Sequence, residues 1–189
     1  MIAPEVLLQG YRLGVFPMGM EDGAIEWFSP QRRGVIPLED FHVPHGLQRT
    51  LRKGAFEVRI NAAFSRVIHA CAKRPETWIN GEIIRSYERL HQLGHAHSVE
   101  AWLDGKLAGG LYGVSLGGAF FGESMYHEVR DASKVALHGL VERMRTQRYV
   151  LLDTQWLTTH LRQFGAVELS RPQYMHLLTR AVALPRSFA

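Results

Sequence analysis

The sequence predicts an α+β fold in which a mixed, mainly antiparallel sheet is flanked by helices, with a small lobe at the N-terminus. Residues 81–93 carry apolar side chains at helical spacing, and residues 97–103 then change to strand-like alternation. Asp104-Gly105 is a hairpin signal, after which residues 106–114 form the returning strand. From residue 132 onward, helical and strand-like segments alternate, so helices are expected to cover the sheet.

The first 33 residues are dense in glycine, proline and aromatic residues, and only residues 4–13 have the pattern of a full helix. We therefore divide the chain into a loop-rich N-terminal lobe, residues 1–33, and a main domain, residues 34–189. The main domain starts with a basic turn or short helix and a strand at residues 56–60. Asn61 is expected to cap a helix that runs to about residue 73, and Gly94 ends the next helix.

The remaining elements follow the hairpin. Residues 117–122 are predicted as a third strand. The C-terminal part is predicted as helix 132–147, strand 149–153, helix 156–164, strand 166–169 and helix 172–183, with Pro172 suited to a first helical turn. In its order of elements, this arrangement resembles the acyl-CoA N-acyltransferase fold.

The length of 189 residues fits one medium domain or one domain with a small appendage, and a composition of 46% hydrophobic and 21% charged residues is that of an ordinary globular protein with ample material for a core. No stretch approaches the ~20 apolar residues of a membrane-spanning helix, and residues 1–10 lack the basic start of a secretion signal. Cys71 is the single cysteine, which excludes an intramolecular disulfide and suits a reducing compartment. We therefore expect a cytoplasmic protein with no membrane partner, and we expect a monomer.

Positive charge is concentrated between residues 45 and 74. Seven arginines and lysines, among them Arg49, Arg52 and Lys53, stand there against one acid, Glu57. The segment therefore carries +6, and because the whole chain carries +4, the remainder carries −2. Such a localised excess favours a surface that binds a polyanion. The alternative is a solvated helix face that happens to be basic.

Ordered motifs extend along nearly the whole chain. Residues 90–102 read LHQLGHAHSVEAW, residues 109–114 read GGLYGV and residues 121–125 read FGESM. They are preceded by GVFP at 14–17, WFSP at 27–30 and TWI at 77–79, and are followed by ASK at 132–134 and DTQ at 153–155. In this order and spacing, the motifs resemble those of the leucyl/phenylalanyl-tRNA–protein transferase family.

The resemblance implies an aminoacyltransferase. Its donor would be aminoacyl-tRNA carrying leucine, phenylalanine or, as a third donor, methionine. Its acceptor would be the α-amine of proteins that begin with Lys or Arg, which are thereby marked for N-degron degradation. Because an aminoacyl ester is already activated, we expect no metal and no other cofactor. The enzyme must orient the two substrates and help to remove a proton from the amine.

Asp153 and Gln155 are the candidate catalytic residues. Asp153 follows an apolar run, so we expect it at the C-terminal end of a strand, where α/β sites commonly open. Alternation along an extended segment would point Asp153 and Gln155 to the same face. The resemblance assigns both to the site, and Gln155 would relay between the carboxylate and the amine. The alternative is that Asp153 caps a helix starting near Trp156.

Substrate-binding residues are also implied by the resemblance. Glu123 and Ser124 would bind the acceptor's α-ammonium group or its basic side chain, whereas the alternative is a strand-end salt bridge from Glu123 to Lys134. Trp78 would stack on the terminal adenine of tRNA, or else pack beneath a loop. Arg49, Arg52 and Lys53 would hold the tRNA backbone. The apolar pocket for the donor side chain would consist of Leu111, Phe120, Met125, Leu137, Leu140 and Leu152.

Two other functions are open to this sequence. An acetyl-CoA-dependent N-acetyltransferase would share the fold, but it needs a glycine-rich pyrophosphate loop, and residues 129–134 read VRDASK without glycine. A non-catalytic RNA-binding module would explain the basic segment but not the apolar pocket beside Asp153 and Gln155.

Overall fold

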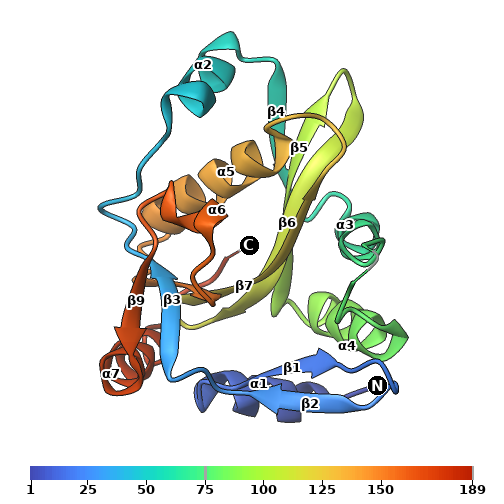
Figure 1. Cartoon of the computed structure of the whole chain (residues 1–189), viewed down its shortest axis with the longest axis vertical. Helices are drawn as coiled ribbons and strands as arrows, with labels where there is room; N and C mark the ends of the chain where they lie inside the picture. Colours follow the sequence, from blue (N-terminus) through green and yellow to red (C-terminus); the bar gives the residue numbers. More distant parts are fainter. Residues whose placement is uncertain (75, 189) are drawn as a thin grey trace.

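The computed structural model describes residues 1–74 and 76–188, and within these residues seven strands form one sheet (Figure 1). Neighbouring strands follow the order β4-β5-β6-β7-β8-β3-β9. All pairs are antiparallel except β7 with β8, which are parallel, so the predicted mixed, mainly antiparallel sheet is confirmed. The strands are β3 (Arg32–Ile36), β4 (Phe56–Ile60), β5 (Ala96–Leu103), β6 (Lys106–Leu116), β7 (Ala119–His127), β8 (Leu151–Gln155) and β9 (Val167–Ser170).

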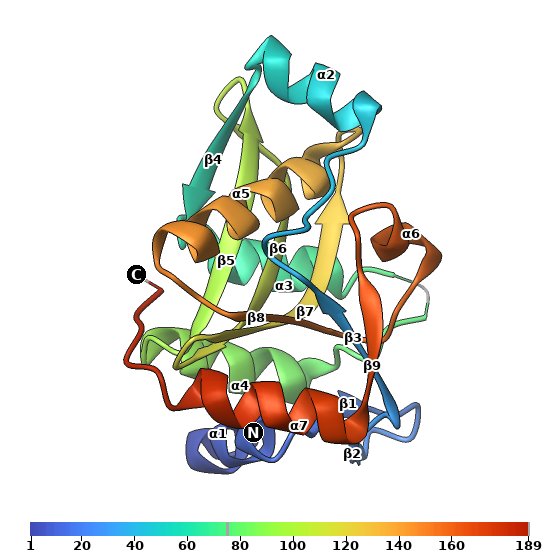
Figure 2. The same cartoon turned by 90° about the vertical axis from the view of Figure 1, so that its left-hand side faces the viewer.

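Helices cover both faces of the sheet, as predicted (Figures 1 and 2). Side chains of α3 and α4 belong to one buried cluster and those of α5 to another, so the sheet separates two cores. Within the described residues, no helix combines the length and the apolar character that crossing a membrane requires. The helices are α1 (Pro4–Arg12), α2 (His45–Lys53), α3 (Phe64–Cys71), α4 (Gly81–Gln92), α5 (Ala132–Thr146), α6 (Thr159–Arg162) and α7 (Arg171–Val182).

The N-terminal segment packs α1 and a short hairpin, β1 (Phe16–Gly19) with β2 (Ile25–Phe28), beneath the main sheet (Figure 1). Leu7 and Tyr11 of α1 are fully buried, so the helix contributes to the main core. The helix was predicted, but the hairpin was missed because its four-residue strands do not alternate between apolar and polar side chains. β3 was missed as well, because it begins with two arginines.

Three predicted boundaries are wrong. Asn61 does not cap α3, which begins at Phe64. Its φ of 58° is left-handed, and its side-chain oxygen accepts a hydrogen bond from the Ser98 N–H at 3.1 Å. The helix expected over residues 156–164 is only the four-residue α6, capped by Thr158. Finally, β7 continues to His127, so Glu123 and Ser124 lie within the strand and do not follow it.

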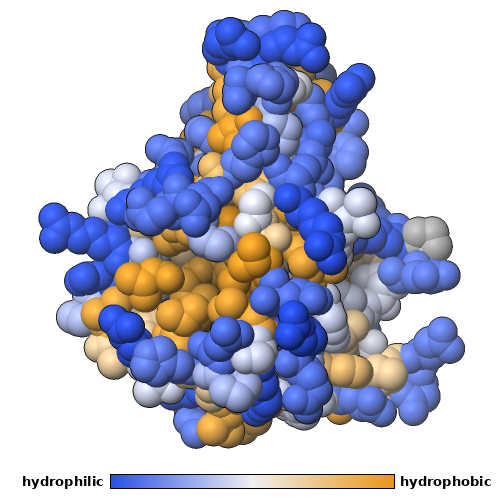
Figure 3. All heavy atoms as spheres, turned by 60° about the vertical axis from the view of Figure 1, so that its left-hand side comes forward, coloured by the Kyte–Doolittle hydropathy of each residue, from blue (hydrophilic) through white to orange (hydrophobic). Residues whose placement is uncertain are grey.

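One side of the molecule exposes an apolar surface. Figure 3 turns the side of β3, β9 and α7 forward and shows a hollowed apolar area surrounded by hydrophilic side chains. A groove between β3, β8, β9 and α7 contains Val150, Val167 and Leu177, which are 54%, 41% and 36% exposed. Two of these elements, β3 and α7, also contribute the hydrogen-bond partners of Asp153 described below.

The chain end folds back from α7 toward α5 (Figure 2). Phe188 is 1% exposed, and its ring lies 4.7 Å from the ring of His97, 4.9 Å from that of Phe120 and 6.0 Å from that of Tyr149. The guanidinium of Arg143 donates hydrogen bonds to the Phe188 carbonyl at 2.6 and 2.9 Å. This segment therefore closes one end of the core beneath α5.

We predict that Phe188→Ala lowers the free energy of unfolding by about 3–5 kcal/mol, the usual effect of removing a buried aromatic ring. The measurement is urea unfolding of the variant and the wild type. A loss below about 0.5 kcal/mol, the size of a typical surface effect, would show that the terminal segment is not part of the core.

Candidate active site

The site lies where β7 and β8 separate. The last paired residues of these strands are Phe121 and Asp153, although both strands continue beyond them. On β7, Gly122 and Ser124 are paired with β6, whereas Glu123 between them is not, so the register shifts there. A bulge of this kind bends a strand and redirects a side chain, and bulges are frequent beside active sites. Glu123 is thereby presented at the opening between the two strands.

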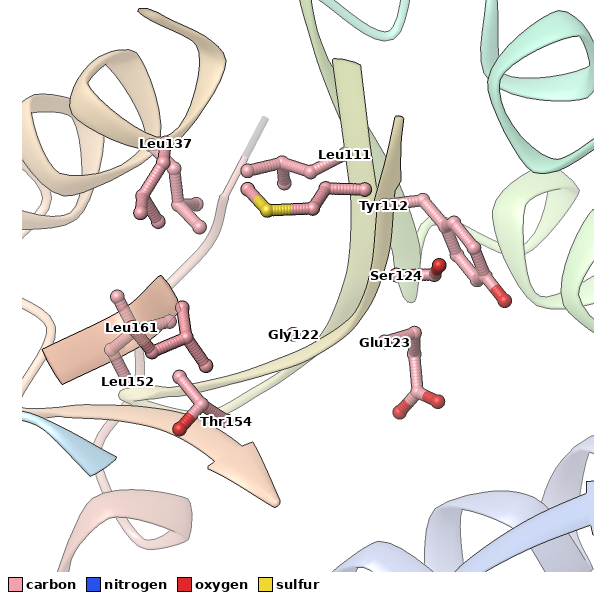
Figure 4. Close-up of a pocket in the computed structure, with 11 residues that line it drawn as sticks. Leu111, Tyr112, Gly122, Glu123, Ser124, Leu137, Leu152, Thr154 and Leu161 are labelled. Carbon is pink, nitrogen blue, oxygen red and sulfur yellow. The ribbon is translucent and has the colours of Figure 1, made fainter. Parts of the chain in front are cut away.

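An apolar cavity of about 110 Å³ lies at this opening. In Figure 4, Leu111, Leu137, Leu152 and Leu161 point toward one another, whereas the Glu123 side chain extends away from them. Phe120, a predicted pocket residue, is not among the lining residues because its ring packs against Phe188. The other five predicted positions do line the cavity: Leu111, Met125, Leu137, Leu140 and Leu152.

A larger and more polar cavity, of about 500 Å³, adjoins the apolar one. The half-buried Trp78 lies on it, together with Gln155, His160 and the exposed Arg74. The two cavities share five lining residues, which are Glu123, Ser124, Met125, Thr154 and Leu161. The structure thus brings Trp78, Glu123, Ser124 and Gln155 together beside the apolar cavity.

Glu123 is held by residues from two elements, α1 and β8. Its Oε1 accepts hydrogen bonds from the Tyr11 hydroxyl at 2.6 Å and from Gln155 Nε2 at 3.1 Å. Because Tyr11 gives its proton to Glu123, the neighbouring Tyr87 hydroxyl donates to the Tyr11 oxygen. Oε2 is buried and has no hydrogen-bond partner among the described residues. Burial raises the pKa of Glu123 to about 7, against the lowering effects of Tyr11 and Gln155. The alternative role for Glu123, a salt bridge with Lys134, is absent from the described contacts, because Lys134 pairs with Asp131 at 2.9 Å.

Asp153 is in a different environment. Its carboxylate accepts hydrogen bonds from Arg33 Nε at 3.0 Å, from Arg33 Nη2 at 2.8 Å and from the Tyr174 hydroxyl at 2.5 Å. The Arg33 guanidinium lies 4.7 Å from the ring centres of both Phe16 and Tyr174. Asp153 is fully buried and lines neither cavity. It belongs to a buried ion pair and does not face the open space.

The predicted place of Asp153 at the end of a strand is wrong, since β8 continues to Gln155. Gln155 has a left-handed φ of 64°, so simple alternation does not apply to it. Asp153 does not cap a following helix either. Instead, its Oδ1 accepts a hydrogen bond from the Gln155 N–H at 2.8 Å. The carboxylate therefore fixes the turned backbone that directs the Gln155 side chain to Glu123.

The sequence profile of the leucyl/phenylalanyl-tRNA protein transferases matches residues 35–179, and that of their N-terminal domain matches residues 1–31. The chain belongs to this family. Leucyl/phenylalanyl-tRNA–protein transferases from Herpetosiphon aurantiacus and Gloeobacter violaceus are 52% and 54% identical to it over 188 residues. These alignments cover 99% of this chain and 98% and 97% of the two relatives. Among solved structures, a ribosomal-protein-alanine N-acetyltransferase from Brucella melitensis biovar Abortus 2308 is similar with a TM-score of 0.43 and 15% identity, over 58% of this chain and 85% of that one.

As a leucyl/phenylalanyl-tRNA protein transferase, the chain is an aminoacyltransferase whose substrates are aminoacyl-tRNA and protein. Family membership therefore decides between the functions that the sequence left open. It favours aminoacyl transfer over acetyl transfer from acetyl-CoA and over a non-catalytic RNA-binding role.

The basic residues predicted to contact tRNA lie apart from the cavities of the transferase. Arg49, Arg52 and Lys53 are exposed on α2, three and four positions apart, so they share one helix face. In Figures 1 and 2, α2 stands at the opposite end of the molecule from α1. Thr50 of α2 donates a hydrogen bond to Asp131 at 3.1 Å, which links this helix to the start of α5.

Four residues of the transferase site were not predicted from the sequence. In the sequence, the tyrosines at positions 11, 87 and 174 look like ordinary core side chains of amphipathic helices. The one usable signal was Arg33, a charged residue directly before the apolar run of residues 34–36. A charge at a buried position requires a partner, but the sequence does not show which acid supplies it.

We predict that Glu123→Gln changes how the stability of the transferase depends on pH. A group whose pKa is raised on folding binds protons more tightly in the folded state, so stability falls as pH rises from the unfolded pKa to the folded pKa. For Glu123, whose pKa rises from 4.5 to about 7, the free energy of unfolding should fall by about 3 kcal/mol between pH 4.5 and 7.

Glu123→Gln lacks this ionisation and should gain stability relative to the wild type over that pH range. Urea unfolding of both proteins at pH 5 and pH 8 measures the difference. All other titrating groups are common to the two proteins, so their contributions cancel in the difference between the two unfolding free energies. A stability difference that is the same at both pH values would contradict the raised pKa.

Proposed function

We propose that this enzyme transfers leucine, phenylalanine or methionine from aminoacyl-tRNA to the α-amine of proteins that begin with Lys or Arg. We further propose that it acts in the cytoplasm as a monomer, needs no cofactor, and marks its acceptors for N-degron degradation. The observation that carries the proposal is the pairing of the two cavities. An apolar cavity suited to the donor side chain adjoins a polar one suited to the acceptor, with Glu123 at their boundary.

The apolar cavity supports an uncharged, medium-sized donor side chain. An engineered apolar cavity of about 150 Å³ admits benzene, so a volume of about 110 Å³ accepts an isobutyl group and accepts a phenyl ring after small side-chain adjustments. Met125 and the surrounding leucines supply that adaptability. A polar donor side chain would lose its hydration there without gaining hydrogen bonds in return.

The polar cavity supports an acceptor with a positively charged N-terminus. Glu123 and Ser124 lie at the junction of the cavities, where the α-ammonium group must approach the donor ester. The reaction is the attack of an amine on an ester, so holding both partners in contact is a large part of catalysis. Gln155 acts with Glu123, to which it donates a hydrogen bond. Asp153 acts as a positioning residue through the backbone of Gln155.

The tRNA would extend from the polar cavity toward α2. Trp78 lies on this cavity and offers an aromatic face to the terminal adenine, a contact worth on the order of 1–3 kcal/mol. The exposed Arg49, Arg52 and Lys53 would bind phosphates of the tRNA body. Contacts of this type do not depend on sequence, which suits an enzyme that selects the amino acid.

The proposal is tested by incubating the enzyme with Leu-tRNA or Phe-tRNA and a peptide that begins with Lys or Arg, followed by mass measurement. We expect the peptide to gain the mass of one donor residue. A matched peptide with an acetylated N-terminus, and one that begins with Asp, serve as controls and should stay unmodified. Transfer to all three peptides would contradict the proposed acceptor specificity.

We predict that Leu111→Trp fills the apolar cavity and reduces transfer of Phe more than transfer of Leu, because the larger donor side chain loses its room. A change of this size in an apolar pocket is worth about 1–3 kcal/mol, or roughly 10–200-fold in selectivity. The matched change Leu137→Ala enlarges the cavity and should shift the ratio toward Phe. Competition between Leu-tRNA and Phe-tRNA measures the ratio. If neither variant moves the ratio, the cavity does not hold the donor side chain.

We predict that replacing Arg49, Arg52 and Lys53 together by Gln weakens binding of charged tRNA and flattens its salt dependence. Each lost phosphate contact lowers the slope of log affinity against log salt by roughly 0.7–0.9. Transfer from an aminoacyl-adenosine, which lacks the tRNA body, should stay near the wild-type rate. Titration of labelled tRNA at several salt concentrations gives the slope.

The control for this triple variant neutralises three other exposed arginines, Arg12, Arg85 and Arg180, which lie on α1, α4 and α7 at the far end from α2. The change in net charge is the same in both variants. Equal weakening by the two would show that only the overall charge matters and that α2 is not a docking face.

A further inference from the structure

The two buried carboxylates at the site differ in what they can reach. Asp153 is saturated by Arg33, Tyr174 and the Gln155 N–H, and it contacts neither cavity. Glu123 is the only acid among the described residues that line the two cavities. A group that exchanges a proton with a substrate must come within hydrogen-bond distance of it. Glu123 lines both cavities and so lies beside the space open to a substrate, whereas Asp153 lines neither.

We propose that Glu123 is the catalytic base that accepts the proton of the acceptor's α-ammonium group, and that Tyr11 of the N-terminal segment is its positioning residue. This inference rests on the proposed function and names the proton acceptor within the same site. It replaces the relay from Gln155 to Asp153 that the sequence suggested.

The hydrogen bonds of Glu123 leave one oxygen for the substrate. Oε1 is occupied by the Tyr11 hydroxyl and by the Gln155 amide. Oε2 is buried and unpartnered among the described residues, which is unusual for a buried carboxylate oxygen. An ammonium group entering from the polar cavity supplies the missing donor. Because Oε1 is held from two sides, Oε2 keeps a fixed direction.

The surroundings of Glu123 also suit proton exchange near neutral pH. Burial, the largest effect, raises its pKa to about 7, close to the value near 8 of a free α-amine. Tyr11 has its own pKa raised by burial and by Glu123, so it keeps its proton and acts only as a donor. The titratable or charged groups around Glu123 are Tyr11 on α1, Arg33 on β3, Cys71 on α3, Tyr87 on α4, Tyr112 on β6 and Asp153 on β8, with Arg74, His127 and His160 on the polar cavity.

The step balances without a further reactant. One proton passes from the α-ammonium nitrogen to Glu123 Oε2, which leaves a neutral amine. The amine nitrogen attacks the ester carbonyl carbon, so a C–N bond forms and the C–O bond to the ribose breaks. The leaving ribose oxygen takes a second proton from the same nitrogen. The products are an amide and a free ribose hydroxyl, and Glu123 then returns its proton to water.

The first experiment compares Glu123→Gln with the wild type at saturating donor and acceptor from pH 6 to pH 9. We expect the wild-type kcat to rise with a midpoint near pH 7, since the charged carboxylate is the active form. Glu123→Gln should lose about 10²-fold or more in kcat at pH 7, the usual effect of removing a general base. The KM values should change little. A loss confined to the KM of the acceptor would overturn the proposal, because Glu123 would then only bind the ammonium group. A kcat within tenfold of wild type would overturn it as well.

The second experiment uses Tyr11→Phe, which removes one hydroxyl and leaves the ring in place. The hydrogen bond from Tyr11 lowers the pKa of Glu123, so its removal raises that pKa. The midpoint of the kcat profile should therefore move to higher pH, with a larger loss of kcat at pH 6.5 than at pH 8.5. A packing role for Tyr11 would reduce kcat by the same factor at every pH, and that result would refute its positioning role.

Failure of the proposed function is distinguishable from failure of this inference. If the wild type does not transfer Leu or Phe to peptides that begin with Lys or Arg, the proposed specificity is wrong. The same pH profiles are then measured with whichever aminoacyl-tRNA and acceptor the wild type uses. If the wild type reacts and Glu123→Gln keeps its midpoint near pH 7, the assignment of the base is wrong.

Discussion

The site depends on the buried ion pair between Arg33 and Asp153. Arg33 is 1% exposed, and its guanidinium connects β3 to β8, to the carbonyl of Gly14 at 3.1 Å and to the rings of Phe16 and Tyr174. It is therefore the point at which the N-terminal segment, the sheet and α7 meet. A buried charge without its partner is strongly unfavourable, so the pair permits few alternative arrangements of these elements. Its effect on function is indirect, because it fixes the turned backbone of Gln155.

The two buried carboxylates of the site, Asp153 and Glu123, lie in different environments, which give them different roles. Asp153 is compensated by a cation and by two further donors. Glu123 is also buried, although it lines the cavities, and it lies against phenols and an amide, with its second oxygen unpartnered among the described residues. Burial without a matching cation raises a carboxyl pKa, and an adjacent cation stabilises the charged form. One carboxylate thus serves the architecture, while the other is available for proton exchange.

The separation of β7 and β8 determines where the two cavities lie. The two cavities adjoin each other where the parallel pairing of β7 with β8 ends, at Phe121 and Asp153. α5 and α6 close the apolar cavity with leucines, whereas Trp78 and His160 border the polar one. In the proposed reaction, the shared wall at Glu123 and Ser124 would hold the ester and the amine together, which is a large part of what an aminolysis requires.

The sequence by itself determined the fold class, the order of the helices and strands that have clear periodicity, and the family. Of the six apolar pocket positions that the resemblance to the family implied, five line the cavity: Leu111, Met125, Leu137, Leu140 and Leu152. The sequence did not determine the short strands β1, β2 and β3, whose few residues carry no usable period. It also did not determine which carboxylate lines the cavities. In the sequence, Glu123 and Asp153 are both acids next to apolar strands. Only the tertiary structure decided between them, because a partner 120 residues away neutralises Asp153, while the bulge in β7 and Tyr11, 112 residues away, expose and orient Glu123. Long-range pairing of this kind leaves no local pattern, so the sequence named the residues of the site but not their division of roles.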